Sequence, residues 1–250
     1  MAINAQSGVG SIRLFNDFCG VANYLALTAD TAPLGDFYAG GESFEVATAG
    51  ALGLQSDALS GVIELLTDTT NLDTIFVGTS VSFDVALMAP IVVEARVRFD
   101  ALTARAAFIG LTSILSVDEQ MDDILDIASA TALTLTAGLA GFFFSSEITA
   151  SADWYMVYNG GTTTGETTAA TIAAGDVAVL GEWQVLRLEV DNNGTARYYI
   201  DGVLQQTTTG AISTTTDVAV CCGVTNTDGA TAARMDVDYL LVTANRDWNA

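Results

Sequence analysis

The feature that most constrains the fold is a long series of short apolar runs separated by clusters of Gly, Asn, Asp and Thr. In Val92–Phe99, every second residue from Val93 is apolar, and Glu94, Arg96 and Arg98 lie between them. Such alternation is typical of a strand with one face in a core and one in water. Many short strands with frequent turn signals predict an all-β sandwich or barrel.

The candidate strands run through the whole chain. They are Ser11–Phe15, Phe37–Tyr38, Ser43–Ala47, Val62–Leu66, Thr74–Val77, Val81–Met88, Ile91–Phe99, Ala106–Leu111, Leu133–Thr136, Gly141–Ser145, Trp154–Tyr158, Thr167–Ile172, Trp183–Val190, Ala196–Ile200, Val203–Thr207, Asp217–Cys222 and Ala233–Val242. We expect Trp183, Val185, Leu186, Leu188 and Val190 to outline a buried face opposite Arg187 and Glu189.

One segment has helical spacing. In Val117–Ala130, apolar residues recur three and four positions apart, with Asp118 in front as a candidate N-cap. We expect one short helix near 118–129, packed on the edge of the sandwich. A partner-binding helix is the alternative.

Two turns predict a meander from Trp183 to Thr207. Asp191-Asn192-Asn193-Gly194 ends in the Asn-Gly pair that favours type I′ geometry, and Asp201-Gly202 forms a second two-residue turn. No internal repeat or linker divides the chain. We therefore expect an N-terminal arm over residues 1–10 and a single jelly-roll domain over residues 11–250.

Charge is the most unusual part of the composition. The chain has 30 acidic residues, eight arginines, no lysine and no histidine, giving a formal net charge of −22. Nucleic acid and anionic membrane surfaces need cations facing them, so neither is an expected partner. A solvated acidic surface that favours solubility is the simpler interpretation, and a cation-binding role is the alternative.

Three cysteines, Cys19, Cys221 and Cys222, make neither a disulfide framework nor a zinc motif. The N-terminal residues have no charged and apolar regions of a signal peptide, and no apolar run is long enough for a transmembrane helix. We expect synthesis in a cytoplasm.

The stretch Trp183–Thr207, WQVLRLEVDNNGTARYYIDGVLQQT, resembles the strand–turn–strand core of laminin-G and concanavalin A-like domains. Met235–Ala244 is similar to the last strand of such domains. Ile12–Gly20 and Ala140–Ser146, followed by Asp153-Trp154, resemble segments of concanavalin-like proteins of tailed bacteriophages. The resemblance implies an all-β, concanavalin-like jelly-roll sandwich of two antiparallel sheets. It also implies a virion structural protein that acts as a homo-oligomer.

Catalytic groups are scarce. Without histidine or lysine, no Ser-His, Cys-His or lysine-activated nucleophile exists. Glucan-cleaving enzymes of this fold carry an E-x-D-x-x-E run, and the nearest run here, Glu189 to Gly194, has Gly194 at the second glutamate position. We expect no enzymatic activity, with an atypical glycoside hydrolase as an alternative.

Calcium is the one cofactor that the resemblance raises, because related domains hold it with Asp and Asn oxygens. The candidates are Asp191, with Asn192 and Asn193, and separately Asn226 and Asp228. The simpler interpretation is that these residues form turns through bonds to their own backbone. Asp122, Asp123 and Asp126 present the same choice on the predicted helix.

Sugar binding needs exposed aromatic rings beside polar groups. Trp154, Tyr155 and Tyr158 are the candidates, next to Asn159. The alternative places Trp154 in the core and Tyr155 outside.

Three functions remain. The first is a bacteriophage virion component, either a capsid decoration or an auxiliary protein, that binds capsid or other virion proteins and is localised to the virion. Its expected contacts are the arm Ala2–Gly10 and the acidic segment Asp118–Asp126. The second is a carbohydrate-binding module of a tail or fibre, and the third is the atypical hydrolase.

Overall fold

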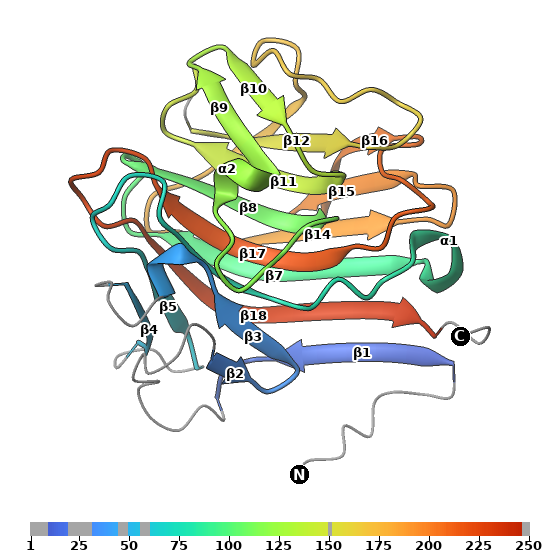
Figure 1. Cartoon of the computed structure of the whole chain (residues 1–250), viewed down its shortest axis with the longest axis horizontal. Helices are drawn as coiled ribbons and strands as arrows, with labels where there is room; N and C mark the ends of the chain where they lie inside the picture. Colours follow the sequence, from blue (N-terminus) through green and yellow to red (C-terminus); the bar gives the residue numbers. More distant parts are fainter. Residues whose placement is uncertain (1–9, 20–31, 45–49, 56–60, 150–151, 247–250) are drawn as a thin grey trace.

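Two antiparallel sheets of eight strands pack face to face in the computed structural model, which describes residues 10–19, 32–44, 50–55, 61–149 and 152–246 (Figure 1). Sheet A follows the order β16-β15-β14-β7-β18-β5-β4, with β1 also paired to β18. Sheet B follows the order β13-β12-β11-β8-β17-β6-β3-β2. The all-β sandwich predicted from the sequence is confirmed.

The strands of sheet A are β1 (Ser11–Asn16), β4 (Ala51–Leu54), β5 (Ile63–Leu66), β7 (Ile91–Phe99), β14 (Gln184–Val190), β15 (Ala196–Ile200), β16 (Val203–Thr208) and β18 (Arg234–Asn245). Those of sheet B are β2 (Ala32–Leu34), β3 (Phe37–Gly40), β6 (Thr74–Gly78), β8 (Arg105–Thr112), β11 (Leu139–Ser145), β12 (Asp153–Asn159), β13 (Ala174–Val177) and β17 (Ala219–Asn226). Because β1 pairs with β18, both ends of the described chain belong to one sheet.

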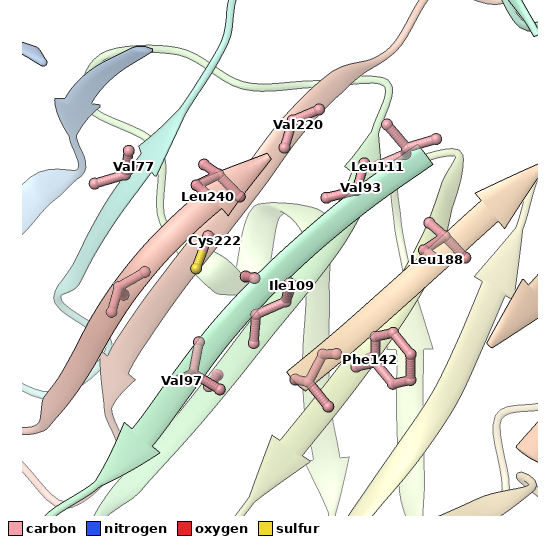
Figure 2. Packing of buried hydrophobic residues seen from close by; sticks show 14 of the residues in the cluster. Val77, Val93, Val97, Ile109, Leu111, Phe142, Leu188, Val220, Cys222 and Leu240 are labelled. Atoms are coloured by element: carbon pink, nitrogen blue, oxygen red, sulfur yellow. The ribbon is translucent and has the colours of Figure 1, made fainter. Parts of the chain in front are cut away.

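The main core lies between the sheets. Inward side chains of β7 and β14, among them Val93, Val97 and Leu188, face Ile109 of β8 and Phe142 of β11 (Figure 2). Each fully buried side chain of this size contributes about 1.5–3 kcal/mol to folding. The alternation read from Val92–Phe99 is confirmed, since β7 is buried at every second residue.

Sheet B is covered on its outer face as well. Its central strands β8, β11 and β17 are buried along their whole length. A two-stranded hairpin, β9 (Leu125–Ser129) with β10 (Ala132–Leu135), and the one-turn helix α2 (Met121–Ile124) build a second core over that face. A strand that is covered on both faces has a continuous apolar sequence, and Ala140–Ser146 (AGFFFSS), which forms most of β11, has such a sequence.

The helix predicted near 118–129 is wrong beyond its central turn. Only Met121–Ile124 is helical, and the cap is Gln120, without a side-chain hydrogen bond, instead of Asp118. Residues Leu125–Ser129 form β9, which pairs with β10, and Leu125 is buried in the second core. Burial on sheet B outweighs the local helical spacing.

Other segments differ from the predicted strands. Val81–Met88 contains a single bridge at Phe83 and then the one-turn helix α1 (Val85–Met88), because Asp84 caps it by accepting the Leu87 N–H at 3.0 Å. Thr167–Ile172 forms turns with one bridge at Thr168. Ser43–Ala47 begins as the 3-10 helix Glu42–Phe44, and residues 45–47 lie outside the described residues.

The two turns of the meander differ in geometry. Asp201 and Gly202 both have positive φ, 49° and 79°, as a type I′ turn requires. At the other turn only Gly194 has positive φ, and its N–H bonds to the Asp191 carbonyl at 2.9 Å, so the type I′ prediction for Asn193-Gly194 is wrong. A type I turn followed by a left-handed glycine explains both observations.

Candidate interaction surface

The two outer faces of the sandwich differ in kind. The second core covers much of the outer face of sheet B, whereas the outer face of sheet A carries half-exposed polar and aromatic side chains. The strand register of sheet A places these side chains in rows across the sheet. We call this the arginine–tryptophan face; its residues are Arg13, Phe15, Gln55, Glu64, Glu94, Arg96, Arg98, Trp183, Arg187, Glu189, Asp191, Arg197, Tyr199, Arg234, Asp236, Asp238 and Tyr239.

Trp183 is the aromatic centre of this face. It directly precedes β14, and its ring lies under two guanidinium groups of β7, with Arg96 4.8 Å and Arg98 4.6 Å from the ring centroid. Cation–π contacts of this kind hold both arginines in place. Trp183 and Val185 therefore belong to the outward side, which corrects the expectation that they share a buried face with Leu186.

A β-bulge in β18 gives Arg96 of β7 its acidic partner. Val237 pairs with Val97 and Tyr239 pairs with Arg96, which leaves Asp238 as the extra residue of β18. Asp238 accepts a hydrogen bond from Arg96 Nη1 at 2.7 Å. The bulge thus re-aims an acid onto the outer face, a common use of bulges.

Glu94 connects neighbouring strands. Its Oε1 accepts a hydrogen bond from the Tyr239 hydroxyl at 2.7 Å, and its Oε2 lies 3.7 Å from Arg187 Nη1. Burial and the bond to Glu94 raise the pKa of Tyr239. The pair with Glu94 links Arg187 of β14 to β7, and Arg187 also pairs with Glu189 of its own strand.

A second network lies at the end of the face. Asp236 accepts hydrogen bonds from Arg98 Nη2 at 2.6 Å and from Arg234 Nε at 3.0 Å. Arg234 also pairs with Glu64 of β5 at 3.1 Å, and Gln55 donates to both acids. The charged groups of this region are therefore held by one another.

The face is electrically balanced. Six of the eight arginines lie on it, and six carboxylates lie beside them: Glu64, Glu94, Glu189, Asp191, Asp236 and Asp238. The formal charge of −22 therefore falls on the rest of the chain. Arg, Trp and Tyr, which this face brings together, are side chains enriched at protein interfaces.

The predicted sugar-binding aromatics lie elsewhere. Trp154 is in the main core, stacked at 5.5 Å on Phe99, with Nε1 donating to Gln184 Oε1 at 3.0 Å. Tyr155 is in the second core, so the expectation that it lies outside is also corrected. Tyr158 is buried as well. Buried rings offer no face to a sugar, because the sheet-covering hairpin and the sandwich enclose both sides of β12.

The predicted calcium residues lie at opposite ends of the sandwich. Asp191, Asn192 and Asn193 follow β14, whose last residue pairs with the first residue of β7, whereas Asn226 is the last residue of β17 and pairs with the first residue of β8. Asn226 Oδ1 accepts the N–H groups of Asp228 and Gly229. Such bonds fit the turn-forming interpretation.

The carboxylates of these turns are also engaged. Asp228 Oδ1 accepts the N–H groups of Ala230 and Thr231, and Asn193 Oδ1 accepts the Thr195 N–H. A hydrogen bond from Arg197 lowers the pKa of Asp191. Within the described residues, no group of three or more His, Cys, Asp and Glu side chains is arranged to hold a metal ion.

The acidic segment Asp118–Asp126 lines a pocket of about 240 Å³ beside α2. Asp122, Asp126 and Glu147 surround it, with Phe143 in its apolar wall. Burial, reinforced by the neighbouring acids, raises the pKa of Asp122 and of Glu147. Residues 1–9 of the predicted arm lie outside the described residues.

The run from Glu189 to Gly194 does not form a paired-carboxylate site. Glu189 sits on β14 and is bonded to Arg187, while Gly194 lies in the turn. The described helices include none long and apolar enough to cross a membrane.

No family model matches the sequence, and no curated protein matches it. Solved structures do match. The β-glucanase of Bacillus licheniformis aligns with a TM-score of 0.55 at 12% identity, covering 95% of this chain and 99% of that one. The carbohydrate recognition domain of Emp46p, in its potassium-bound form, aligns with a TM-score of 0.56 at 11% identity, covering 92% and 98%. A carbohydrate esterase of the Shiga toxin-encoding bacteriophage phi24B aligns with a TM-score of 0.50 at 16% identity, covering 89% and 97%.

These likenesses, at low identity, define the fold. The chain has the concanavalin A-like lectin/glucanase jelly-roll fold, as its resemblance to such domains implied. The sequence predicts the alternation along each strand but not the arginine–tryptophan face, which several strands build together. The sequence does contain one indication of this face, because most of the arginines that form it alternate with apolar residues along predicted strands.

Proposed function

We propose that this protein is a structural component of a bacteriophage virion, a capsid decoration or auxiliary protein, and that it attaches to other virion subunits through the arginine–tryptophan face. The observation that carries the proposal is the gathering of six arginines, Trp183 and two tyrosines on one open sheet face of a strongly acidic chain.

The geometry favours a protein partner. Arg, Trp and Tyr are the side chains that most often dominate binding energy at protein interfaces. Here ion pairs and the ring of Trp183 already hold Arg96 and Arg98, so little side-chain freedom is lost on binding. The local balance of charge also lets another acidic subunit approach this face without net repulsion from it.

The phage setting rests on the segments that resemble concanavalin-like phage proteins and on the shared fold of the phi24B protein. The attachment proposal assigns no catalytic role to any residue. It requires shape and polar complementarity alone, which the fold can supply.

The test uses particles of the phage that encodes the chain. We expect the protein in the proteome of purified particles. We also expect tagged protein to co-sediment with particles that lack it. Trp183→Ala and Arg13→Glu should weaken co-sedimentation at least ten-fold. Arg246→Glu, which makes the same charge change off this face, should bind as the wild type does.

Thermal unfolding of each variant confirms that it is folded. Absence of the chain from purified particles would contradict the proposal. So would equal co-sedimentation of all variants.

A glycan-binding module is the second candidate. Tyr199 lies on the open face, with its hydroxyl 3.5 Å from Glu189 Oε2, and aromatic rings beside carboxylates suit sugars. A glycan array with and without calcium tests it. Binding that is lost in Tyr199→Ala would favour this candidate, whereas no binding would count against it.

A further inference from the structure

One edge of the molecule joins the free ends of both sheets. β13 is the last strand of sheet B and β16 is the last strand of sheet A, and the two strands contact each other. The Cβ that Gly175 lacks would lie 3.4 Å from Gln205 Cγ, which shows how closely β13 approaches β16. We call these two strands, with Leu180 after β13, the β13–β16 edge.

This edge exposes large apolar side chains. Val177 is 49% exposed, Leu180 57%, Val203 59% and Leu204 50%. A single exposed apolar residue needs no explanation. β16 exposes two in succession, and they lie on opposite faces of the strand, because Val203 pairs with the inward Ile200 and Leu204 pairs with the outward Tyr199. Natural proteins usually protect a free edge strand with charge or cover it.

Charge does not protect β16. The chain from Val203 to Thr216 contains no charged residue, although the protein has 30 acids. β13 carries a single acid, Asp176. Charge therefore does not keep another strand from pairing with β16, and this edge would be protected if another surface covered it.

We propose that the β13–β16 edge binds the same edge of a second copy of this chain about a two-fold axis. Two molecules of charge −22 repel, so they associate only where the surface is uncharged. A different protein that binds this acidic chain would use basic groups, and those groups would need acidic side chains of this chain to contact. β16 offers no acid, which suits a like-charged copy.

The two-fold axis also fits the strand. Neighbouring β16 strands related by such an axis run antiparallel, so Val203 contacts side chains of the other copy's β16 on one face of the joined sheet and Leu204 contacts them on the other face. A β-bulge leaves Gln205 without a partner on β15 and bends the strand, so apolar side chains as well as main chain make the contact.

Sedimentation equilibrium of the purified chain tests the proposal. We expect a dimer whose dissociation constant falls as salt is raised, because salt screens the repulsion between the acidic copies. Leu204→Asp should weaken the dimer at least ten-fold. Leu87→Asp is the matched control, since Leu87 is 46% exposed but lies in α1, and it should leave the dimer unchanged.

Thermal unfolding shows whether each variant is folded. A monomer at all protein and salt concentrations would overturn the proposal. A dimer that Leu204→Asp does not weaken, or that Leu87→Asp weakens equally, would overturn it too. The proposal does not rest on virion attachment, because self-association is measured with this chain alone.

Discussion

Asp236 of β18 accepts hydrogen bonds from both Nε and Nη2 of Arg98 on β7, at 3.1 and 2.6 Å, and its side chain is only 2% exposed. The same carboxylate also bonds Arg234. One buried acid therefore anchors two arginines of the arginine–tryptophan face. Removing its charge leaves both guanidiniums without their nearest partner.

We expect Asp236→Asn to lower the free energy of unfolding by about 2–3 kcal/mol, because breaking a buried ion pair leaves unpaired charge behind. Urea denaturation at pH 7 measures the change. The exposed Asp118→Asn should alter it by less than about 0.5 kcal/mol. Equal effects of the two substitutions would show that the network adds nothing to stability.

Trp154→Phe tests the structural role of a residue that the sequence also suggested for sugar binding. The substitution preserves an aromatic ring beside Phe99 but removes the donor to Gln184 Oε1. We expect a loss of about 1–3 kcal/mol, the cost of leaving a buried acceptor unpaired. Denaturant unfolding measures it; a variant as stable as the wild type would contradict the assignment.

Two turn glycines should differ in their tolerance of alanine. Both have positive φ, 75° at Gly194 and 79° at Gly202. An added Cβ at Gly194 would lie 2.3 Å from the Ile212 carbonyl oxygen, whereas at Gly202 nothing lies within 4 Å. Gly202→Ala should cost about 1–2 kcal/mol from backbone strain alone. Gly194→Ala should cost more, and thermal unfolding that ranks them in the reverse order would refute this account.

Asp73 should make stability depend on pH. Its burial, with the nearby carboxylates of Asp68 and Glu42, raises its pKa to about 7. Between about pH 4 and 7 the folded chain keeps a proton that the unfolded chain has released, so the free energy of unfolding falls as pH rises through this window. Asp73→Asn should remove this contribution and raise stability at pH 8.

Urea unfolding of both proteins at several pH values gives the difference between them, which cancels the other titrating groups. That difference should grow from pH 4 to 7. A constant difference would show that Asp73 does not titrate in this range.

Thiol titration should separate the cysteines. Cys19 is exposed, whereas Cys221 and Cys222 are buried. Burial raises the pKa of both, that of Cys222 to about 12, which disfavours the reactive thiolate. We expect one thiol per folded chain to react with a thiol reagent at pH 8, and three after unfolding. Three reactive thiols in the folded protein would contradict the burial of β17.

The local sequence predicts strands well where one face is buried and the other is wet. β7 and β15 alternate in the sequence as they do in the structure, and the Asp201-Gly202 turn has the geometry its residues favour. These features depend on neighbouring residues alone, so the chain carries them without tertiary information.

Tertiary contacts decided the remainder. Leu125 belongs to a strand and Tyr155 to a core because a hairpin folds over sheet B, and no local pattern reports which face a distant segment will cover. Arginines far apart in the chain, such as Arg13 and Arg187, share one face only because sheet pairing brings β1 and β14 into the same sheet. By itself the sequence determined the alternation, the turns and the excess of acidic residues. The pairing of distant strands decided where the few arginines gather. Long-range packing sets the strand register, and the register fixes which side chains become neighbours.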